Sequence, residues 1–269
     1  QGALEMLGMP YNGSSVLASA LCMDKFKTNN FLRSKGFDVP AGLLIEKSDF
    51  EKDENNILGL IEKNIGLPAI IKPHDDGCSV MVQKAKTKDE LNICLKKIFS
   101  SNKHFALVEE CIFGMELTVG VTGNDVARAL PPSQTVTSGD VLSIEEKFLP
   151  GAGENQTPAK LEPQVIKLVQ YTIEQVYTAV GCKGYSRIDC FYQSEKISKT
   201  GKPRLIIIEI NTLPGMTPAT CIFHQATEIG IQPMEFIDLI VSLGLEEHAS
   251  IKDNFPAEKL TNFSNETAQ

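Results

Sequence analysis

The stretch IIIEINTLPGMT at residues 206–217 decides the fold, because an apolar strand ends there in side chains that can bind a cation. Leu205 begins a run of four apolar residues, which is typical of a strand buried on both faces. Glu209 and Asn211 follow, one residue apart, before a Pro-Gly turn. Since side chains alternate along a strand, both polar side chains project from the same face.

A second stretch, GYSRIDCF at residues 184–191, has the same design, with Arg187 and Asp189 one residue apart. Two such strands side by side would collect two carboxylates, an amide oxygen and a guanidinium, and such oxygen donors suit Mg²⁺. The alternative is an ordinary salt bridge of Arg187 with Asp189 or Glu209. A carboxylate that follows four apolar residues is costly to bury unless a positive group meets it, which favours a metal–nucleotide site.

The two motifs in this order carry a family resemblance. R-I-D at 187–189, then E-x-N-T-x-P-G-M-T at 209–217, resembles the metal-binding core of the D-alanine–D-alanine ligases, within the ATP-grasp superfamily. QGALEMLGMPYNGSSVLASALCMDK at 1–25 and the run down to about residue 245 are similar as well. The resemblance implies an α+β ATP-grasp fold, in which two α+β subdomains with mainly antiparallel sheets clamp a nucleotide.

The resemblance also divides the chain and implies that the family's usual N-terminal domain is lacking. The expected segments are the end of that domain with a linker helix at 1–24, ATP-grasp subdomain 1 at 25–108, subdomain 2 with the metal site at 109–245, and a loosely held polar tail at 246–269. The hydrophobic pattern predicts helices at 15–35, 49–66, 87–100, 163–181 and 222–245, the last with a break at 231–233.

Composition excludes several classes of protein. A chain of 269 residues with 42% apolar and 22% charged content is ordinary for a soluble globular protein of two modest domains. The net charge of −8 argues against a nucleic-acid surface, and no apolar run reaches the length of a membrane span. Seven cysteines, an odd number without a CxxC pair, predict reduced thiols in the cytoplasm.

LPAIIKPHDDGCSV at 67–80 has the pattern of a phosphate clamp, because an apolar strand ends in Lys72 and a small-residue turn follows. The alternative is a β-hairpin with a surface lysine. The resemblance implies that Lys25 and Lys72 contact the nucleotide phosphates and that Ser79 is catalytic. Taken alone, Lys25 is as well explained as a solvated helix lysine. Relatives carry a serine where this chain has Cys78, and a thiol is a poor substitute in hydrogen bonding.

FALVEECIFGMELTVGV at 105–121 is predicted to be a strand, a short link and a second strand. The resemblance makes residues 109–112 the hinge that binds adenine, with Glu109, backbone N–H and C=O groups of Glu110 and Ile112, and the ribose bound by Glu116. An acidic hairpin explains the residues equally well.

Residues 122–160 are the least regular part of the chain and are predicted to include a lid over the site. The resemblance places Lys147 at the γ-phosphate, with Phe148 where relatives have a tyrosine, a change that could relax the acceptor preference toward D-lactate. It places Gly215, Thr220 and Cys221 at the acceptor substrate.

The function implied is an ATP-dependent ligase that joins two D-alanines through an acyl phosphate, for peptidoglycan precursors. Arg187, Lys147 and Ser79 would be catalytic. Asp189, Glu209 and Asn211 would hold two Mg²⁺ ions, or Mn²⁺ in their place. The expected partners are ATP and D-alanine, without nucleic acid or membrane, and with a homodimer as the assembly. The alternative is an impaired ATP-grasp derivative that binds nucleotide or serves a structural role.

Overall fold

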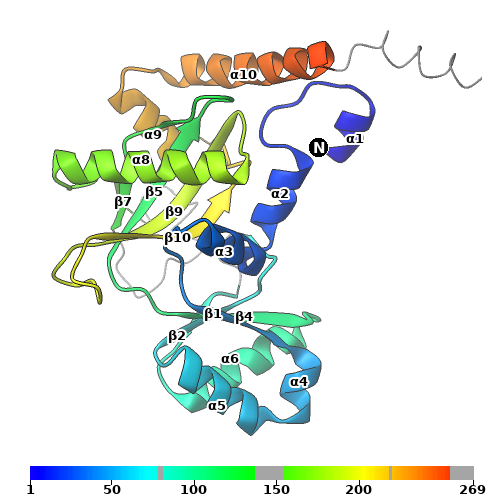
Figure 1. Ribbon diagram of the computed structural model, residues 1–269, viewed down its shortest axis with the longest axis vertical. Coiled ribbons are helices and arrows are strands. Elements are labelled where there is room, and N and C mark those ends of the chain that lie inside the picture. Colours follow the sequence, from blue (N-terminus) through cyan, green and yellow to red (C-terminus); the bar gives the residue numbers. More distant parts are fainter. Residues whose placement is uncertain (78–80, 137–153, 218–219, 255–269) are drawn as a thin grey trace, which may run out of the picture.

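The computed structural model describes residues 1–77, 81–136, 154–217 and 220–254. Its strands form two separate antiparallel sheets, one of four strands and one of six. Each sheet has its own helices and its own apolar core. We call the part around the four-stranded sheet the first lobe and the part around the six-stranded sheet the second lobe; they lie at the bottom and the top of Figure 1.

The first lobe is a sheet covered by three helices (Figure 1). The strand order is β1-β4-β2-β3. The strands are β1 (Gly42–Glu46), β2 (Ala69–Lys72), β3 (Gln83–Ala85) and β4 (Phe105–Glu110), and the helices are α4 (Lys47–Lys52), α5 (Glu54–Asn64) and α6 (Lys88–Ser100). β4 ends at Glu110, so the subdomain boundary predicted between 108 and 109 falls inside this strand, and it stays a proposal.

The amphipathic pattern at 87–100 forms α6, as predicted. The Thr87 hydroxyl accepts a hydrogen bond from the Glu90 N–H (3.2 Å), which is an N-cap. Leu91, Leu95 and Ile98 are fully buried against the sheet, because residues three and four apart lie on one face of a helix. This helix is scaffold.

The second lobe has the strand order β10-β9-β5-β7-β8, with β6 paired to β5. Helix α8 (Pro163–Val180) covers one face of this sheet, and α9 (Cys221–Glu228) and α10 (Pro233–Asn254) pack together beside it (Figure 1). Its strands are β5 (Met115–Thr122), β6 (Arg128–Ala129), β7 (Ser133–Val136), β8 (Glu154–Gln156), β9 (Tyr185–Gln193) and β10 (Arg204–Asn211).

Alternation along the strands separates the core from a polar face. In β5, Leu117, Val119 and Val121 are fully buried in the core under α8, whereas Glu116 and Thr118 project to the opposite face. β9 follows the same rule, with apolar side chains under α8 and its charged side chains on the other face. The sequence pattern alone therefore determines which face of the sheet carries the polar residues.

The two motif strands are neighbours, as predicted. β9 and β10 pair antiparallel, with Glu209 opposite Asp189 and Asn211 opposite Arg187. A register shift between Ile207 and Glu209 interrupts the ladder just before the acidic residue. The consecutive residues Ile206 and Ile207 are both buried, which confirms a strand covered on both faces.

Two predicted helices are each divided by an aspartate. The continuous helix expected at 15–35 is α2 (Val16–Met23) followed by α3 (Lys25–Ser34), because Asp24 is extended and accepts from the Lys27 N–H (3.0 Å). The helix expected at 49–66 is likewise α4 and α5, separated by Asp53, which accepts from the Asn56 N–H (3.1 Å). In both cases the side chain begins a new helix by capping it. A short helix α1 (Gly2–Met6) precedes them.

The prediction of a tail from Glu246 onward is wrong for the first part of that segment, because α10 continues to Asn254. The first two residues of the expected tail instead contact loops of the second lobe: Glu246 accepts from Asn124 Nδ2 (3.1 Å), and Glu247 pairs with Lys183 (3.4 Å). Residues 255–269 lie outside the described residues.

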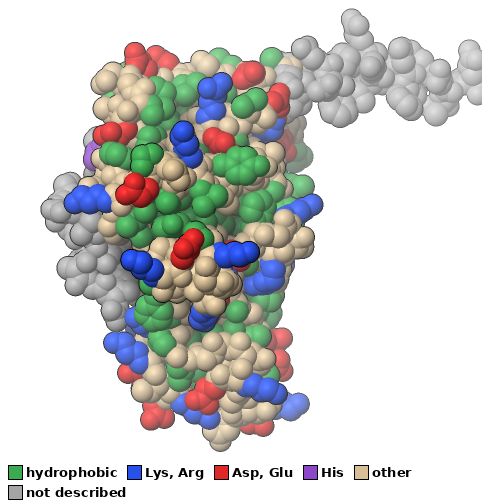
Figure 2. Space-filling model, turned by 60° about the vertical axis from the view of Figure 1, so that its left-hand side comes forward, with side chains coloured by type: hydrophobic (Ala, Val, Ile, Leu, Met, Phe, Trp, Pro, Cys, Tyr) green, Lys and Arg blue, Asp and Glu red, His purple; other side chains and the backbone are tan. Residues whose placement is uncertain are grey.

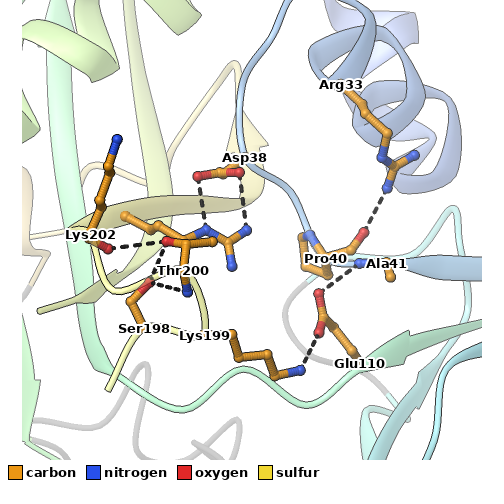
Figure 3. Close-up of polar contacts among 10 residues, drawn as sticks. Arg33, Asp38, Pro40, Ala41, Glu110, Ser198, Lys199, Thr200 and Lys202 are labelled. Carbon is orange, nitrogen blue, oxygen red and sulfur yellow. Dashed lines mark hydrogen bonds and ion pairs between the residues drawn. The ribbon is translucent and has the colours of Figure 1, made fainter. Parts of the chain in front are cut away.

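Two connectors join the lobes, at residues 35–41 and 111–114, and the first is hydrogen-bonded to Glu110, the β4 residue that precedes the second. The Glu110 N–H donates to the Ala41 carbonyl (2.9 Å), and the Ala41 N–H donates to Glu110 Oε1 (3.1 Å). Figure 3 shows this contact, in which the end of β4 is fixed to the start of β1.

The β9–β10 hairpin, residues 194–203, lies against the first connector and the end of β4 (Figure 3). Arg204 at its base makes two bonds to the Asp38 carboxylate, each 3.0 Å. Lys199 from the hairpin reaches Glu110 Oε2 at 3.4 Å. The chain segments that pass between the lobes therefore contact the hairpin end of β9 and β10, opposite to the end that carries Arg187, Asp189, Glu209 and Asn211.

Gly123 occupies a conformation that only glycine adopts without strain, with φ of +123° and the Val126 carbonyl oxygen 2.1 Å from where a Cβ would lie. We expect Gly123→Ala to lower the free energy of unfolding by about 1–3 kcal/mol. Gly59 inside α5 has open space around it, so Gly59→Ala should stabilise by about 0.5–1 kcal/mol. Urea unfolding of both variants checks this prediction, which fails if they change stability in the same direction.

Candidate active site

A pocket of about 370 Å³ lies on the polar face of the second lobe. Its lining comes from α2, α3, β5, β7, β8, β9, β10, the turn after β10, the start of α9 and, from the first lobe, the segment after β2. Nine residues predicted from the sequence line it: Lys25, Glu116, Arg187, Asp189, Glu209, Asn211, Gly215, Thr220 and Cys221. The structure therefore brings together residues that are up to about two hundred positions apart.

Asp189 is held by Arg187 and Thr118. Arg187 Nε and Nη2 each lie 3.1 Å from one carboxylate oxygen of Asp189, and the Thr118 hydroxyl donates to Asp189 Oδ1. The Asp189 charge raises the pKa of Arg187 above its ordinary value, so the guanidinium stays positive. The salt bridge considered as an alternative is thus present, inside the pocket and beside the other candidate ligands.

Glu209 is paired with Lys25, at 3.1 Å between Nζ and Oε1. Lys25 is buried, and its Nζ also donates to the Asp76 carbonyl of the segment that follows β2. The description of Lys25 as a solvated helix lysine is wrong, because the break at Asp24 turns the first residue of α3 into the pocket. Two cations and two carboxylates therefore compensate one another in this site.

Asn211 completes the oxygen donors on this face. Its Oδ1 accepts from the Leu213 N–H (3.1 Å), which fixes the turn after β10. No group of three or more His, Cys, Asp or Glu side chains gathers as a metal site among the described residues. The predicted set has two carboxylates, opposite each other across β9 and β10, and an amide oxygen on the same face. These donors fit a hard divalent cation that takes its remaining ligands from phosphate and water.

Lys72 and Glu109 form a buried ion pair in the first lobe, with 2.5 Å between Nζ and Oε2. Asn29 Nδ2 donates to the other oxygen of Glu109 (2.7 Å). The surface-lysine alternative for Lys72 is therefore wrong, since Lys72 is 5% exposed and Glu109 is 2% exposed. Neither residue lines the pocket of the second lobe.

The segment after Lys72 is pinned to its surroundings. The Lys25 N–H donates to the His74 carbonyl (2.8 Å), and Lys103 Nζ contacts the carboxylates of Asp75 (3.0 Å) and Asp76 (2.6 Å). Burial opposes ionisation of Asp75, but the hydrogen bond from Lys103 and the positive charges of His74 and Lys103 together lower the pKa of that carboxyl. The stem of the proposed phosphate loop is thus fixed beside Lys25.

The hinge has fewer free backbone groups than predicted. The Glu110 N–H is already donated to Ala41, so it cannot donate to a base. Its C=O group and the Ile112 backbone stay proposals for adenine binding. Glu116 lines the pocket two residues before Thr118 on the same face of β5, as expected of a ribose ligand.

On the acceptor side, Gly215, Thr220 and Cys221 all line the pocket. The Thr220 hydroxyl donates to the Thr217 carbonyl (2.7 Å), so it is engaged within its own turn. Burial raises the pKa of the Cys221 thiol above its ordinary value, which keeps it neutral. Ser79 and Lys147, with Cys78 and Phe148, lie outside the described residues.

Sequence reasoning missed several pocket residues, among them Thr118. It follows Glu116 by two positions, so the alternation used for the motif strands could have identified it. Six further residues carry no comparable signal, since the place of each depends on the tertiary fold: Ser19, Cys22, Met23, Thr135, Asn155 and Thr212.

Comparison with known proteins decides the family. The sequence model described as "D-ala D-ala ligase C-terminus" matches residues 31–242. The chain belongs to the D-alanine–D-alanine ligase family. Within this family, the chain is 33% identical over 251 residues to the D-alanine–D-alanine ligase of Carboxydothermus hydrogenoformans, covering 91% of the chain and 76% of that relative. It is 34% identical to the enzyme of Leptospira interrogans, covering 91% and 69%.

Solved structures of D-alanine–D-alanine ligase family members show the same ATP-grasp fold. The ligase of Bacillus anthracis complexed with ATP has a TM-score of 0.72 at 28% identity, covering 93% of this chain and 75% of that one. VanG D-Ala:D-Ser ligase of Enterococcus faecalis has a TM-score of 0.77 at 28% identity, covering 90% and 67%. The α+β ATP-grasp fold expected from the sequence is therefore confirmed.

Of the helices in the described part of the chain, none could span a membrane. On the face drawn in Figure 2, lysine and arginine side chains are scattered among acidic ones, without the extended basic patch that a nucleic-acid surface needs.

Proposed function

We propose that this D-alanine–D-alanine ligase family member joins two D-alanine molecules with conversion of ATP to ADP and phosphate. The observation that carries the proposal is the pocket in which Arg187, Asp189, Glu209 and Asn211 meet Lys25. The donor binds through its carboxylate, takes the γ-phosphoryl group and becomes an acyl phosphate. The amine of the acceptor then attacks the acyl carbon, and phosphate leaves.

The residues act by placement and charge neutralisation, because phosphoryl transfer needs little covalent help from the protein. Lys25 and Lys72 neutralise phosphate oxygens, and Glu116 accepts from the ribose hydroxyls. The Arg187 guanidinium, held in one orientation by its two bonds to Asp189, stabilises the charge that builds on the transferring group. Ser79 and Lys147 would add contacts from outside the described residues.

Asp189, Glu209 and Asn211 would hold the divalent cation that ATP-dependent members of this family generally need, and we propose Mg²⁺. When bound, it would supply positive charge to the phosphates. The ion pairs of Asp189 with Arg187 and of Glu209 with Lys25 hold both carboxylates on the pocket face.

We place the reaction in the cytoplasm, where ATP is available and thiols stay reduced, and we propose that its product enters peptidoglycan precursors. The six cysteines among the described residues are free thiols, which agrees with this location.

The proposal predicts ADP release that depends on D-alanine. With Mg-ATP and D-alanine, the protein should form one ADP and one phosphate for each D-alanyl-D-alanine, as measured by a coupled assay and by chromatography of the dipeptide. L-alanine is the control and should give neither product. Binding of Mg-ADP by calorimetry without any dipeptide would support the nucleotide-binding derivative instead, and binding of no nucleotide would exclude both and leave the structural role.

A further inference from the structure

Gln225 is a fully buried polar side chain that none of the roles above uses. It lies in α9, one turn after Cys221, and points at the sheet of the second lobe. Its Oε1 accepts from the Gly120 N–H (2.8 Å), and its Nε2 donates to the Thr118 carbonyl (2.8 Å) and to the Ser133 hydroxyl (2.9 Å). Every polar atom of the amide thus has a partner in the sheet.

The amide of Gln225 takes the place of a missing strand. β5 pairs with β7 at residues 117–118 and with β6 at 121–122, and Pro131 and Pro132 connect those two strands without an N–H to offer. In a parallel pair of strands, a residue donates its N–H to the residue before the one opposite it and accepts from the N–H of the residue after that one. The amide of Gln225 makes the same two bonds, to the Thr118 carbonyl and from the Gly120 N–H. The side chain of a helix therefore completes the ladder of β5.

Glycine at position 120 allows this close approach. A Cβ there would lie 2.8 Å from Gln225 Oε1 and 2.8 Å from Ile222 Cγ1. The hydrogen bonds of Gln225 thus set the distance between α9 and β5, and at this distance there is no room for a side chain at position 120.

The same contact links the walls of the pocket. Thr118 of β5 and Thr220, Cys221 and Ile222 of α9 line it from two sides. Ser133, the third partner of Gln225, also hydrogen-bonds to the Cys221 thiol and to the Thr157 hydroxyl (2.6 Å). Through these bonds Gln225 ties the first turn of α9 to the strand whose Thr118 hydroxyl binds Asp189.

We infer that Gln225 is a positioning residue that holds the first turn of α9 in place as the binding wall for the acceptor substrate, an inference that rests on the proposed ligase function. Its loss lets α9 move relative to Asp189 and weakens acceptor binding. Nucleotide binding is affected less, because the hinge and Lys72 lie in and beside the first lobe and β5, which carries Glu116, keeps its pairing with β9.

Steady-state kinetics of Gln225→Met and Gln225→Glu test this inference, with Gln170→Met as the matched control. Gln170 makes a similar bond from α8 to the Ala129 carbonyl (3.0 Å), but α8, unlike α9, contributes no residue to the pocket. In Gln225→Met, the KM for the acceptor D-alanine should rise at least about tenfold, while the KM for ATP stays within about twofold. Gln225→Glu, whose buried carboxyl can accept from Gly120 and, when protonated, donate to Thr118, should restore acceptor binding at mildly acidic pH.

Equal changes in both KM values, an acceptor KM no higher than in Gln170→Met, or no rescue in Gln225→Glu would overturn the inference. Amide hydrogen exchange gives a readout independent of turnover. In Gln225→Met, exchange should accelerate at residues 221–226 and at Gly120 but not in α8; unchanged exchange in α9 would also overturn it. If the wild-type protein has no ligase activity but Gln225→Met shows this exchange pattern, the proposed function is contradicted and the positioning contact is established.

Discussion

Replacing Arg187 with methionine should lower kcat by about 10³-fold or more, with a small loss of stability. An arginine that stabilises a transferring phosphoryl group is worth roughly 10³–10⁵ in rate. The fold should tolerate the change, because the Thr118 hydroxyl still binds Asp189 and the Arg187 side chain is 28% exposed. Single-turnover kinetics with Mg-ATP and D-alanine, together with thermal unfolding, separate the two effects.

Arg204→Met is the matched control for this experiment. Arg204 makes the same kind of two-bond ion pair, with Asp38 at 3.0 Å, but at the far end of the same strands. Its loss should change kcat by less than about threefold, in line with the small energies of partly exposed pairs. If Arg187→Met and Arg204→Met reduce kcat equally, or if Arg187→Met unfolds the protein, Arg187 is a structural residue and its catalytic role is wrong.

Replacing Glu109 with glutamine should lower the free energy of unfolding by about 3 kcal/mol, because it leaves the charge of Lys72 buried without its partner. The side chains of this pair are 6% and 3% exposed, and the N–H₂ group of the glutamine must face one of two donors, Lys72 Nζ or Asn29 Nδ2. Chemical denaturation of the variant measures the loss.

Glu110→Gln supplies the comparison at the adjacent position. Glu110 pairs with Lys199, whose side chain is 83% exposed, so this change should cost less than about 1 kcal/mol. The glutamine oxygen can still accept from the Ala41 N–H. Equal effects of the two substitutions would mean that the Lys72–Glu109 pair contributes no more than a surface contact.

Alternation along strands made much of the site predictable. Arg187 with Asp189, and Glu209 with Asn211, are each one residue apart, so their shared face followed from the sequence, and the pairing of β9 with β10 placed them opposite each other. The four-residue apolar run of β10 and the Thr87 cap of α6 were equally local signals. Such features need only neighbours along the chain, and this is why sequence reasoning finds them.

Features that depend on distant contacts were not predictable. Asn29 and Glu109 are eighty positions apart, and no local pattern announces that they share a hydrogen bond. Gln225 reads as an ordinary polar residue of an amphipathic helix, and only the gap beside β5 gives it three partners. The predicted tail failed similarly, since Glu246 and Glu247 contact loops of the second lobe.

Transfer of ¹⁸O from D-alanine to phosphate tests the central claim most directly. In the proposed reaction, one carboxylate oxygen of the donor becomes the bridging oxygen of the acyl phosphate and leaves with phosphate when the amine attacks. With D-alanine labelled in its carboxylate and Mg-ATP, mass spectrometry should find one ¹⁸O in each phosphate, in equal amount to the dipeptide formed. Unlabelled phosphate formed together with dipeptide, or AMP and pyrophosphate in place of ADP and phosphate, would contradict the account.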